Sequence, residues 1–569
     1  MPSTAFQWLS LVGIIWLQSI NGTNTNFPAY SSQLKILLSI SQVQLNNLAF
    51  ASDAGKLFGW FSGVASLYLP LWLVLMIGST LGLAGYGVQY LFITNQISSL
   101  SYWHVFLLTV LAGNSICWIN TVCYVVTIRN FRSYSQIAVG LTTSYQGLSA
   151  KIYTDIVGAF FPRKRAKGFL FLNSILPLIA SVAAAPLARD IDFRRPKNMG
   201  TGFIVIFLIT IATGIYAVIT SLEFISSKMS PFGNLISIGV SLLLLLVIPV
   251  AEKIKELVKS RYTNRERVYH FTVDENAEVQ GVENEVTERQ DASEVHEICV
   301  KETQDAERVE ENGVKERQDA SEVHEICVKE RQDAERVQEN GVKERQDASE
   351  VHEICVKEEV GVKLMLRRVD FWLYFFVYFL GATIGLVFLN NLGQIAESRG
   401  CSGTSSLVSL SSSFGFFGRL MPSLVDYFYR SKHVISRPAC VLVLMVPTAG
   451  AFFLLLNRTD PALYISTAVI GICTGAITSI SVSITTELFG TKNFSVNHNV
   501  VVANIPVGSF LFGYFAALIY RKEAYGQGKC MGMECFRKTF IVWGSLCFLG
   551  TFLALILYVR TRKFYSQRH

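Results

Sequence analysis

One charged segment divides this chain into two apolar parts. Between Asp274 and Glu359 the sequence holds 28 acidic and 11 basic residues, a local net charge of −17 in a chain whose net charge is +7. Such a segment cannot lie in hydrocarbon, because each charge near the centre of a spanning helix costs about 3 kcal/mol. The flanking parts consist of repeated apolar runs of about 20 residues, the length with which an α-helix crosses a bilayer. The sequence therefore predicts an all-α, polytopic membrane protein with one long soluble loop.

The apolar runs predict about 14 spanning helices, eight before the charged segment and six after it. The expected helices cover about residues 6–29, 45–66, 71–94, 102–128, 134–160, 168–188, 202–222, 233–250, 371–391, 404–425, 438–456, 462–486, 498–520 and 538–559. We expect four parts: a six-helix bundle in residues 1–190, two additional helices in 191–250, a charged cytosolic loop in 251–370, and a second six-helix bundle in 371–569. Two bundles joined by a long loop are the organisation of many secondary transporters.

Basic residues near the helix ends predict the orientation in the membrane. An even number of helices places the charged loop and both termini on the same side. That side carries six Lys and Arg residues at the start of the loop, from Lys253 to Arg267, and four in the tail, from Arg560 to Arg568. We expect this side to be the cytosolic one. The membrane is expected to be the plasma membrane or an endomembrane. Two loops disagree with the bias, because residues 162–168 and 521–538 fall on the opposite side and also carry several basic residues.

Two cysteines, Cys530 and Cys535, share the second of these loops. They can pair if the loop faces an oxidising compartment. Glycine pairs spaced as GxxxG predict close packing between helices, since lipid provides no hydrophobic drive for helix association. These pairs are Gly59/Gly63, Gly78/Gly82, Gly381/Gly385 and Gly471/Gly475.

The charged segment contains an internal repeat. The sequence ERQDASEVHEICVKE begins at Glu288, Glu316 and Glu344, with a period of 28 residues. A period of four heptads would keep helical register, but glutamate and glycine at the would-be seam argue against a coiled coil. A solvated spacer, disordered or partly helical, is the favoured interpretation. Each copy also places a histidine and a cysteine three residues apart, but two ligands per copy do not complete a metal site.

Motifs typical of enzymes are missing from the sequence. There is no GxSxG, HExxH or GxxxxGK[ST] motif and no histidine cluster in the expected helices. We therefore expect no catalytic residues, cofactor, metal or nucleic-acid partner. The expected partners are the lipid bilayer and a small-molecule solute, with protons as a candidate coupling ion.

Polar side chains inside the expected helices mark candidate contacts for a solute, because such groups are costly in lipid and usually face a cavity or one another. The first expected helix holds a polar run from Asn21 to Asn26, where Gly22 and the following Pro28 favour an unwound stretch. Hydrogen bonding between helices is the competing explanation. The candidates for the substrate path are Asn21, Thr23, Asn24, Asn26, Asn114, Asn120, Gln146, Asn390, Asn391 and Gln394.

Ionisable residues in the expected helices form two possible pairs. Asp53 and Lys56 are three residues apart, and Lys151 and Asp155 four apart, so each pair can meet on one helix face. A proton-coupled carrier needs a titratable group in the solute path, and Asp53 is the candidate. The second pair is interpreted as a structural ion pair.

Five stretches of the sequence resemble the plant nodulin-like, Nuclear-Fusion-Defective-type branch of the major facilitator superfamily. They are NGTNTNFPAYSSQLK (21–35), SQVQLNNLAFASDAG (41–55), PLWLVLMIGSTLGLAGYGVQYL (70–91), QGLSAKIY (146–153) and NNLGQIAESRG (390–400). The resemblance covers both halves and implies two six-helix bundles with a substrate path between them near mid-membrane. The family commonly has Lys-Gly-Tyr before GLS, whereas this chain has Thr143, Ser144 and Tyr145. A solute contact made by that lysine would be lost here.

The superfamily also implies a cytosolic gating motif, Gly-x-x-x-Asp followed by a basic residue. In the second half, GRLMPSLVDYFYR supplies Asp426 with Arg419 and Arg430, although Pro422 stands where glycine is usual. The first half has Leu67 in place of the acid. The gating contact is therefore expected mainly from the second bundle.

Two functions fit these observations. The leading hypothesis is a secondary transporter that moves a small polar solute by alternating access. The alternative is a non-transporting membrane receptor or scaffold that acts through its cytosolic loop. The two differ in whether the cavity between the bundles or the charged loop is indispensable.

Overall fold

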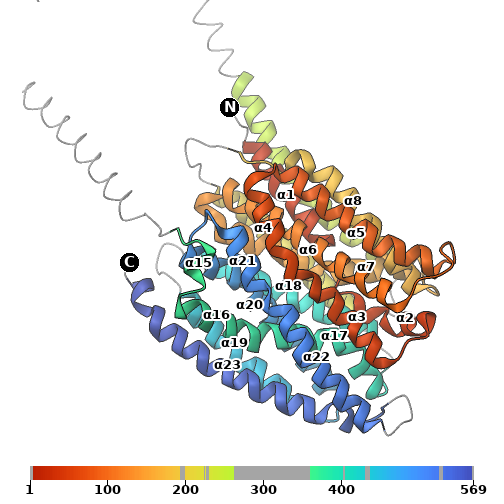
Figure 1. The fold of residues 1–569 in the computed structure, drawn as a ribbon. Helices are drawn as coiled ribbons and strands as arrows, with labels where there is room; N and C mark the ends of the chain where they lie inside the picture. The colour runs from red at the N-terminus through yellow and green to blue at the C-terminus, as the bar shows by residue number, and fades with distance from the viewer. Residues whose placement is uncertain are drawn as a thin grey trace, which may run out of the picture. The chain divides into compact units, whose positions relative to one another are not determined.

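The computed structural model describes residues 4–191, 199–222, 225, 230–261, 359–401, 404–429, 436–524 and 530–566. Within these ranges the chain forms helices and connecting turns, without a strand (Figure 1). The charged repeats between residues 262 and 358 lie outside the described residues, so their role as a spacer stays a prediction.

Ten helices of the described part are long and apolar enough to cross a membrane, and one shorter apolar helix, Thr4–Ile20, precedes them. The ten are Leu71–Ile93, Tyr102–Asn130, Arg165–Leu187, Gly200–Ser221, Pro231–Arg261, Val369–Ser398, Arg437–Leu454, Asp460–Phe489, Phe494–Glu523 and Glu534–Ser566. The chain is therefore an integral, multi-pass membrane protein made of helices, which confirms the predicted fold class. The total of about 14 spans and the four domain boundaries remain predictions.

The N-terminal bundle is drawn in red to orange in Figure 1. Its elements are α1 (Thr4–Ile20), η1 (Phe27–Ala29), α2 (Ser31–Leu38), α3 (Gln42–Ala54), η2 (Gly55–Phe58), α4 (Gly59–Tyr68), α5 (Leu71–Ile93), α6 (Tyr102–Asn130), η3 (Arg132–Tyr134), α7 (Ser135–Phe160), α8 (Arg165–Ala184) and η4 (Ala185–Leu187). The chain then continues into α9 (Gly200–Ser221) and α11 (Pro231–Leu244). Helix α9 packs against α18 of the second bundle, and α11 packs against α7.

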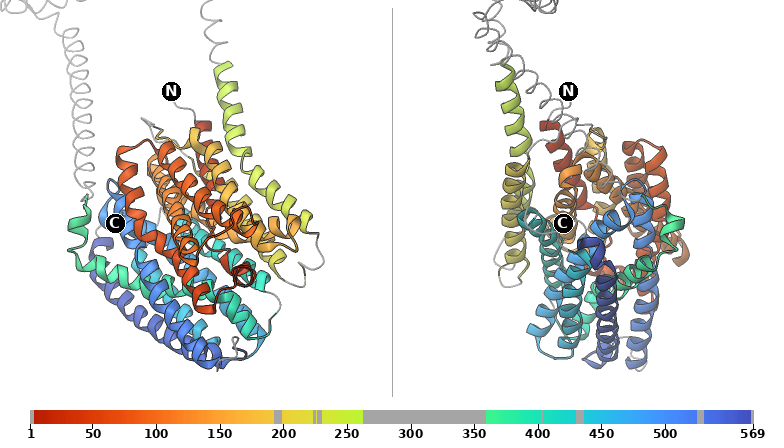
Figure 2. Two further views of the ribbon diagram at one scale, coloured as in Figure 1. Left: turned by 45° about the vertical axis from the view of Figure 1, so that its right-hand side comes forward. Right: turned by 90° about the vertical axis from the view of Figure 1, so that its left-hand side faces the viewer.

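The C-terminal bundle is drawn in green to blue, and Figure 2 shows the two bundles as neighbouring groups of helices. Its elements are α15 (Val362–Met365), α16 (Val369–Tyr378), η5 (Phe379–Thr383), α17 (Ile384–Ser398), α18 (Thr404–Tyr429), α19 (Arg437–Leu454), α20 (Asp460–Phe489), α21 (Phe494–Val502), α22 (Asn504–Glu523) and α23 (Glu534–Ser566). The element η5 is a turn of π-helix, so α16 and α17 form one interrupted span.

The first helix ends earlier than the sequence predicted. The expected helix over residues 6–29 stops at Ile20, and the polar run from Asn21 to Asn26 forms turns that lead into η1. Asparagine and threonine side chains compete for backbone hydrogen bonds, and Pro28 donates none, so this run does not sustain a helix. The expected unwinding is therefore present.

The glycine pairs lie where helices meet, as predicted. A Cβ atom added to Gly78 would come within 2.6 Å of Trp118 on α6, and one added to Gly82 within 2.7 Å of Ser115. In the second bundle, a Cβ atom added to Gly475 would lie 2.4 Å from the carbonyl oxygen of Gly415 on α18. Only glycine allows helix backbones to approach this closely, so these positions permit close helix packing inside each bundle.

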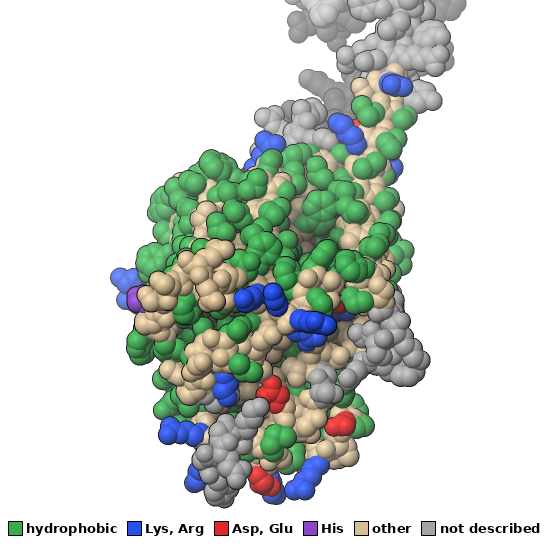
Figure 3. Space-filling model, turned by 90° about the vertical axis from the view of Figure 1, so that its right-hand side faces the viewer, with side chains coloured by type: hydrophobic (Ala, Val, Ile, Leu, Met, Phe, Trp, Pro, Cys, Tyr) green, Lys and Arg blue, Asp and Glu red, His purple; other side chains and the backbone are tan. Residues whose placement is uncertain are grey.

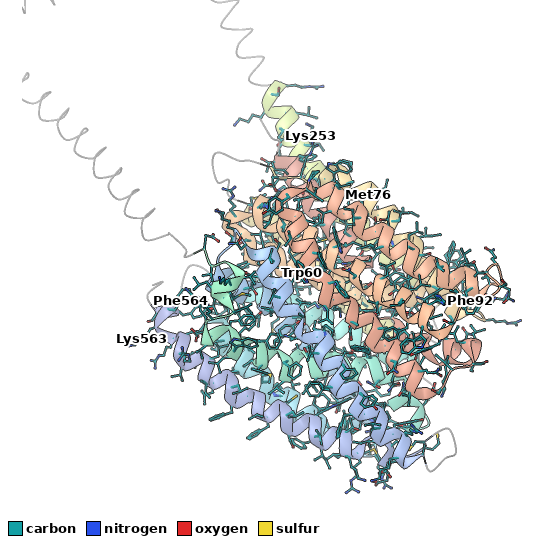
Figure 4. All side chains as sticks on the ribbon, viewed as in Figure 1. Trp60, Met76, Phe92, Lys253, Lys563 and Phe564 are labelled. Carbon is teal, nitrogen blue, oxygen red and sulfur yellow. A yellow bond between two sulfur atoms is a disulfide. The ribbon has the colours of Figure 1, made fainter. Side chains whose placement is uncertain are left out.

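Large apolar side chains cover the outside of the molecule. Figure 3 shows hydrophobic side chains over much of one face. Exposed large apolar residues of the described part include Leu208, Phe232, Val443 and Phe548. In Figure 4, Met76 and Phe92 mark helix α5 of the first bundle and Phe564 the end of α23 in the second. An exposed apolar surface of this extent is expected where lipid is the solvent.

Candidate functional site: a polar cavity between the bundles

The two bundles enclose a polar cavity with two adjoining compartments. Five residues line both compartments: Asn24, Thr25, Gln146, Leu386 and Arg419. The first, of about 60 Å³, also reaches Asp53 and Asn390, and the second, of about 80 Å³, reaches Lys56 and Asn120. A water molecule needs about 10–15 Å³ on this scale, so the cavity has room for several waters or a small solute. We call it the central cavity.

Arg419 is a buried cation that faces both compartments. It comes from α18, is 9% exposed, and its Nη1 donates to Gln146 Oε1 of α7 at 2.7 Å. Its Nε has no hydrogen-bond partner, and no carboxylate of the described residues pairs with it. This guanidinium therefore joins the two bundles through a neutral amide, and its Nε–H group can still donate a hydrogen bond to another acceptor.

The bond to Gln146 continues as a chain of amides into the first bundle. Gln146 Nε2 donates to Asn120 Oδ1 at 3.2 Å, and Asn21 Nδ2 donates to the same oxygen at 2.9 Å. The unwound stretch after α1 places Asn21 there, because a continuing helix would carry the side chain elsewhere. Side chains from α18, α7 and α6 and from the stretch after α1 thus form one network across the bundle interface.

Asp53 connects an ion pair within the first bundle to a contact across the interface. Lys56 Nζ lies 2.5 Å from Asp53 Oδ1, and both side chains are buried. Asn390 Nδ2 of α17 donates to Asp53 Oδ2 at 2.9 Å. Both carboxylate oxygens therefore have a partner: Oδ1 pairs with Lys56 of the same bundle, and Oδ2 accepts from Asn390 of the other bundle.

Further contacts between the bundles close one end of the central cavity, which we call the α2 end. Gln394 Nε2 of α17 donates to Asn46 Oδ1 of α3 at 2.6 Å, and Ser32 of α2 donates to Glu397. Arg165 donates to Ser405 at 2.5 Å at the same end of the bundles. Charged and polar groups of both bundles therefore meet at the α2 end of the cavity.

A second set of contacts closes the opposite end, which we call the α21 end. Ser495 Oγ of α21 donates to the carbonyl of Gly63 at 3.1 Å, and Asn499 Nδ2 donates to Thr121 Oγ1 at 3.0 Å. Gly63 permits this approach, because a Cβ atom there would lie 2.8 Å from the Ser495 carbonyl oxygen. The cavity is thus closed at both ends.

The predicted path residues separate into two groups. Asn24, Asn120, Gln146 and Asn390 line the central cavity. The others do not line either compartment but lie close to it or within a bundle: Asn21, Thr23, Asn26, Asn114, Asn391 and Gln394.

Several members of the second group have partners that explain their burial. Thr23 accepts a hydrogen bond from Tyr86 at 3.2 Å, and Asn26 pairs with Asn173 at 3.0 Å. Asn391 donates to the carbonyl of Val387 in its own helix at 2.8 Å. Asn114 Oδ1 is buried without a partner in the described part of the chain. The contacts of Thr23, Asn26 and Asn391 match internal hydrogen bonding, the competing explanation from the sequence, whereas the Asn114 side-chain oxygen is not explained in this way.

The gating motif expected in the second bundle is arranged differently from the prediction. Arg419 lies seven residues before Asp426, about 10 Å along the helix, and does not pair with it. Asp426 instead pairs with Arg437 of α19 at 2.6 Å, and Arg437 also reaches Glu487 of α20 at 3.2 Å. The third member of the motif, Arg430, lies outside the described residues. The motif therefore divides into a cavity cation and a separate ion-pair cluster.

The second predicted ion pair lies away from the central cavity. Lys151 Nζ is 2.7 Å from Asp155 Oδ1, which agrees with its structural interpretation. The pair borders a different hollow, lined also by Arg165 of α8 and Asn234 of α11.

The sequence did not single out several residues that line the central cavity. Thr474 of α20 is buried there with its hydroxyl group unpartnered, and His498 and Asn499 of α21 line the second compartment. The polar positions of α20 recur among small residues in TGAITSISVSITTE, a pattern that also fits plain helix packing. Only the arrangement of the two bundles distinguishes the cavity positions.

A helical membrane protein with a closed polar cavity between two bundles has the form of a membrane transporter. Two family models match the parts of the chain on either side of residues 255–352: "Nodulin-like" matches residues 7–254, and "NFD4, C-terminal domain" matches residues 353–567. The chain is 35% identical over 579 aligned positions to Protein NUCLEAR FUSION DEFECTIVE 4 of Arabidopsis thaliana, covering 99% of this chain and 90% of that protein. The chain belongs to the nodulin-like family, as the sequence resemblance implied.

Two solved transporter structures align with most of the chain. A proton:xylose symporter, XylE, aligns with 96% of this chain and 95% of its own at a TM-score of 0.49 and 9% identity. A proton dependent oligopeptide transporter aligns with 98% of this chain and 99% of its own at a TM-score of 0.46 and 11% identity.

Proposed function

We propose that the chain is a secondary transporter that moves a small polar solute by alternating access. One observation carries the proposal: a polar cavity lies buried between the two bundles, and contacts between the bundles close it at both ends. Rocking of one bundle against the other would break one set of contacts while the other set stays closed. The amide, hydroxyl and charged groups that line the cavity would replace water around the bound solute.

Asp53 is the proposed proton-coupling residue. Its carboxylate holds Lys56 in its own bundle and Asn390 across the interface. Protonation removes the charge and turns one acceptor oxygen into a hydroxyl donor, so both contacts would weaken. The other titratable groups that interact with this carboxylate are Tyr86 and Cys117, which come from α5 and α6. Proton binding would thereby favour separation of α17 from α3, which is the movement that opens the α2 end.

The orientation is part of the proposal, with both termini and the charged loop in the cytosol. The described part of the chain contains a disulfide between Cys530, before α23, and Cys535, in the first turn of α23, at the end of the helix that the even helix count assigns to the opposite side. Disulfides persist in oxidising compartments, which supports an extracytosolic or lumenal position for this end of α23.

The coupling role is tested with the Asp53→Asn variant in proteoliposomes. Solutes are first screened by thermal shift on the purified full-length protein, since a ligand that binds only the folded state raises its Tm. For a solute found in this way, Asp53→Asn should abolish uptake driven by a pH gradient and retain counterflow exchange, because exchange moves no net proton.

Asp155→Asn is the matched control, because it also neutralises a buried acid of a Lys–Asp pair but lies outside the central cavity. It should retain both activities. Loss of both activities in Asp53→Asn, with the protein still folded, would contradict the coupling role.

A further inference from the structure

The charges of the central cavity do not balance. Among the residues that line it, Asp53 is the carboxylate, Lys56 and Arg419 are the lysine and arginine, and His498 adds a buried imidazole. Asp53 and Lys56 neutralise one another at 2.5 Å. Arg419 has no carboxylate partner in the described part of the chain, so the cavity carries one positive charge in excess.

An unpaired cation is costly at this depth. Taking a charge out of water carries a large desolvation penalty, which hydrogen bonds to neutral groups offset only in part. Among the described residues Arg419 has two such bonds, one to Gln146 Oε1 and a longer one to the Thr143 carbonyl at 3.4 Å, and its buried Nε has no acceptor there. A packing role would be served at lower cost by an apolar side chain, so the guanidinium indicates a ligand of opposite charge.

Other donors lie at the same cavity. Thr474 lines the first compartment with Arg419, and its buried hydroxyl group, which lies against Gly385 of α17, lacks a hydrogen-bond partner in the described residues. Asn24 lines both compartments from the unwound stretch. Arg419 and Thr474 come from the second bundle and Asn24 from the first, so a ligand bound among them would contact both.

We propose that the central cavity binds a small carboxylate monoanion, held by the Arg419 guanidinium with Thr474 as a second donor. This assignment rests on the proposed transport function and names the class of its solute. A guanidinium binds a carboxylate through two parallel N–H···O bonds, a geometry that lysine cannot offer. One excess positive charge matches a monoanion better than phosphate, which carries about two negative charges near neutral pH. The compartments, of about 60 and 80 Å³, favour a ligand of few atoms.

The same arrangement links the bound anion to the bundle interface. Arg419 Nη1 donates to Gln146 Oε1 of the opposite bundle at 2.7 Å. A carboxylate on the guanidinium competes for these donors, so binding replaces a contact between the bundles with a contact to the solute. Occupancy would therefore ease the relative movement of α7 and α18.

The test compares acids with their amides on the purified full-length protein. Sodium L-lactate and sodium acetate are titrated by calorimetry and thermal shift beside lactamide and acetamide, which keep the shape and lack the charge. The wild type should bind the acids and not the amides, and Arg419→Gln should weaken lactate binding roughly 10- to 100-fold. Arg419→Lys keeps the charge without the fork and should bind less tightly than the wild type. Arg537→Gln, an exposed arginine on α23, is the control and should bind as the wild type does.

Each outcome decides the proposal. Equal binding of acids and amides, no binding of either acid, tighter binding of phosphate than of lactate, or unchanged lactate affinity in Arg419→Gln would overturn it. If Arg419→Gln does not fold, the comparison of acid with amide on the wild type still decides. Counterflow in proteoliposomes separates this inference from the transport proposal. Lactate that binds through Arg419 and never exchanges contradicts transport alone, whereas exchange of neutral solutes without acids contradicts the carboxylate site alone.

Discussion

An added methyl group at Gly63 tests whether the α21 end is a closed gate. The Cβ atom of Gly63→Ala would lie 2.8 Å from the Ser495 carbonyl oxygen and 2.9 Å from the Val496 Cα. These are backbone atoms, so relief requires α4 and α21 to move apart. Overpacking of this kind costs about 1–3 kcal/mol, and the cost applies only to the state in which this end is closed. The population open at this end should therefore rise roughly 5- to 150-fold.

The assay is the labelling rate of Cys117, a native cysteine that lines the second compartment. In protein whose other free cysteines are replaced, a membrane-impermeant maleimide should label Cys117 faster in Gly63→Ala, and only from the side of the α21 end. Gly87→Ala on α5 is the control, because its Cβ atom would meet Ser174 at an ordinary 3.7 Å. An unchanged rate in Gly63→Ala, or an equal increase in both variants, would refute the gate.

Three further predictions concern other contacts. Asn390→Ala removes a hydrogen bond between the bundles and should raise the rate of Cys117 labelling from the α2 end by about fivefold. Asn391→Ala is the control and should leave this rate unchanged, because the Asn391 amide donates to a carbonyl of its own helix. Equal effects of the two substitutions would contradict the assignment. Arg437→Met removes the cation that pairs with the largely buried carboxylates of Asp426 and Glu487 and should cost about 3–5 kcal/mol, measured as a large fall in Tm; an unaltered Tm would contradict a structural cluster. Deletion of Glu288–Lys357 should leave folding and transport intact, and loss of transport in folded protein would favour the receptor or scaffold alternative.

The sequence was sufficient for the fold class, because composition decides it. Apolar runs of spanning length and a segment of net charge −17 leave few arrangements other than two helical groups and a soluble loop. Local chemistry was equally informative at the end of the first helix, where Gly22 and Pro28 mark the unwound stretch. Ion pairs three or four residues apart, such as Asp53 with Lys56, follow from helix geometry alone.

The cavity was less predictable, since it depends on which helices face each other. Asn390 and Asn391 are adjacent in the sequence and chemically identical, yet one reaches Asp53 across the interface and the other bonds to its own helix. Arg419 was grouped with Asp426 because both fit a loop motif, whereas the packing of α18 against α7 turns Arg419 toward Gln146. Contacts of this kind join residues more than 250 positions apart, and no local pattern encodes them.

The central claim is that the cavity opens at one end at a time. Paired cysteines at Asn46 and Gln394 lock the α2 end, and paired cysteines at Thr121 and Asn499 lock the α21 end, when joined by a short bifunctional thiol reagent. Cys117 is then labelled with an impermeant maleimide from either side of the membrane. The account predicts that the first lock leaves labelling only from the side of the α21 end, and the second lock only from the side of the α2 end. Two results would contradict alternating access. One is labelling that continues from both sides in fully cross-linked protein, and the other is a loss of labelling from both sides when either end is locked.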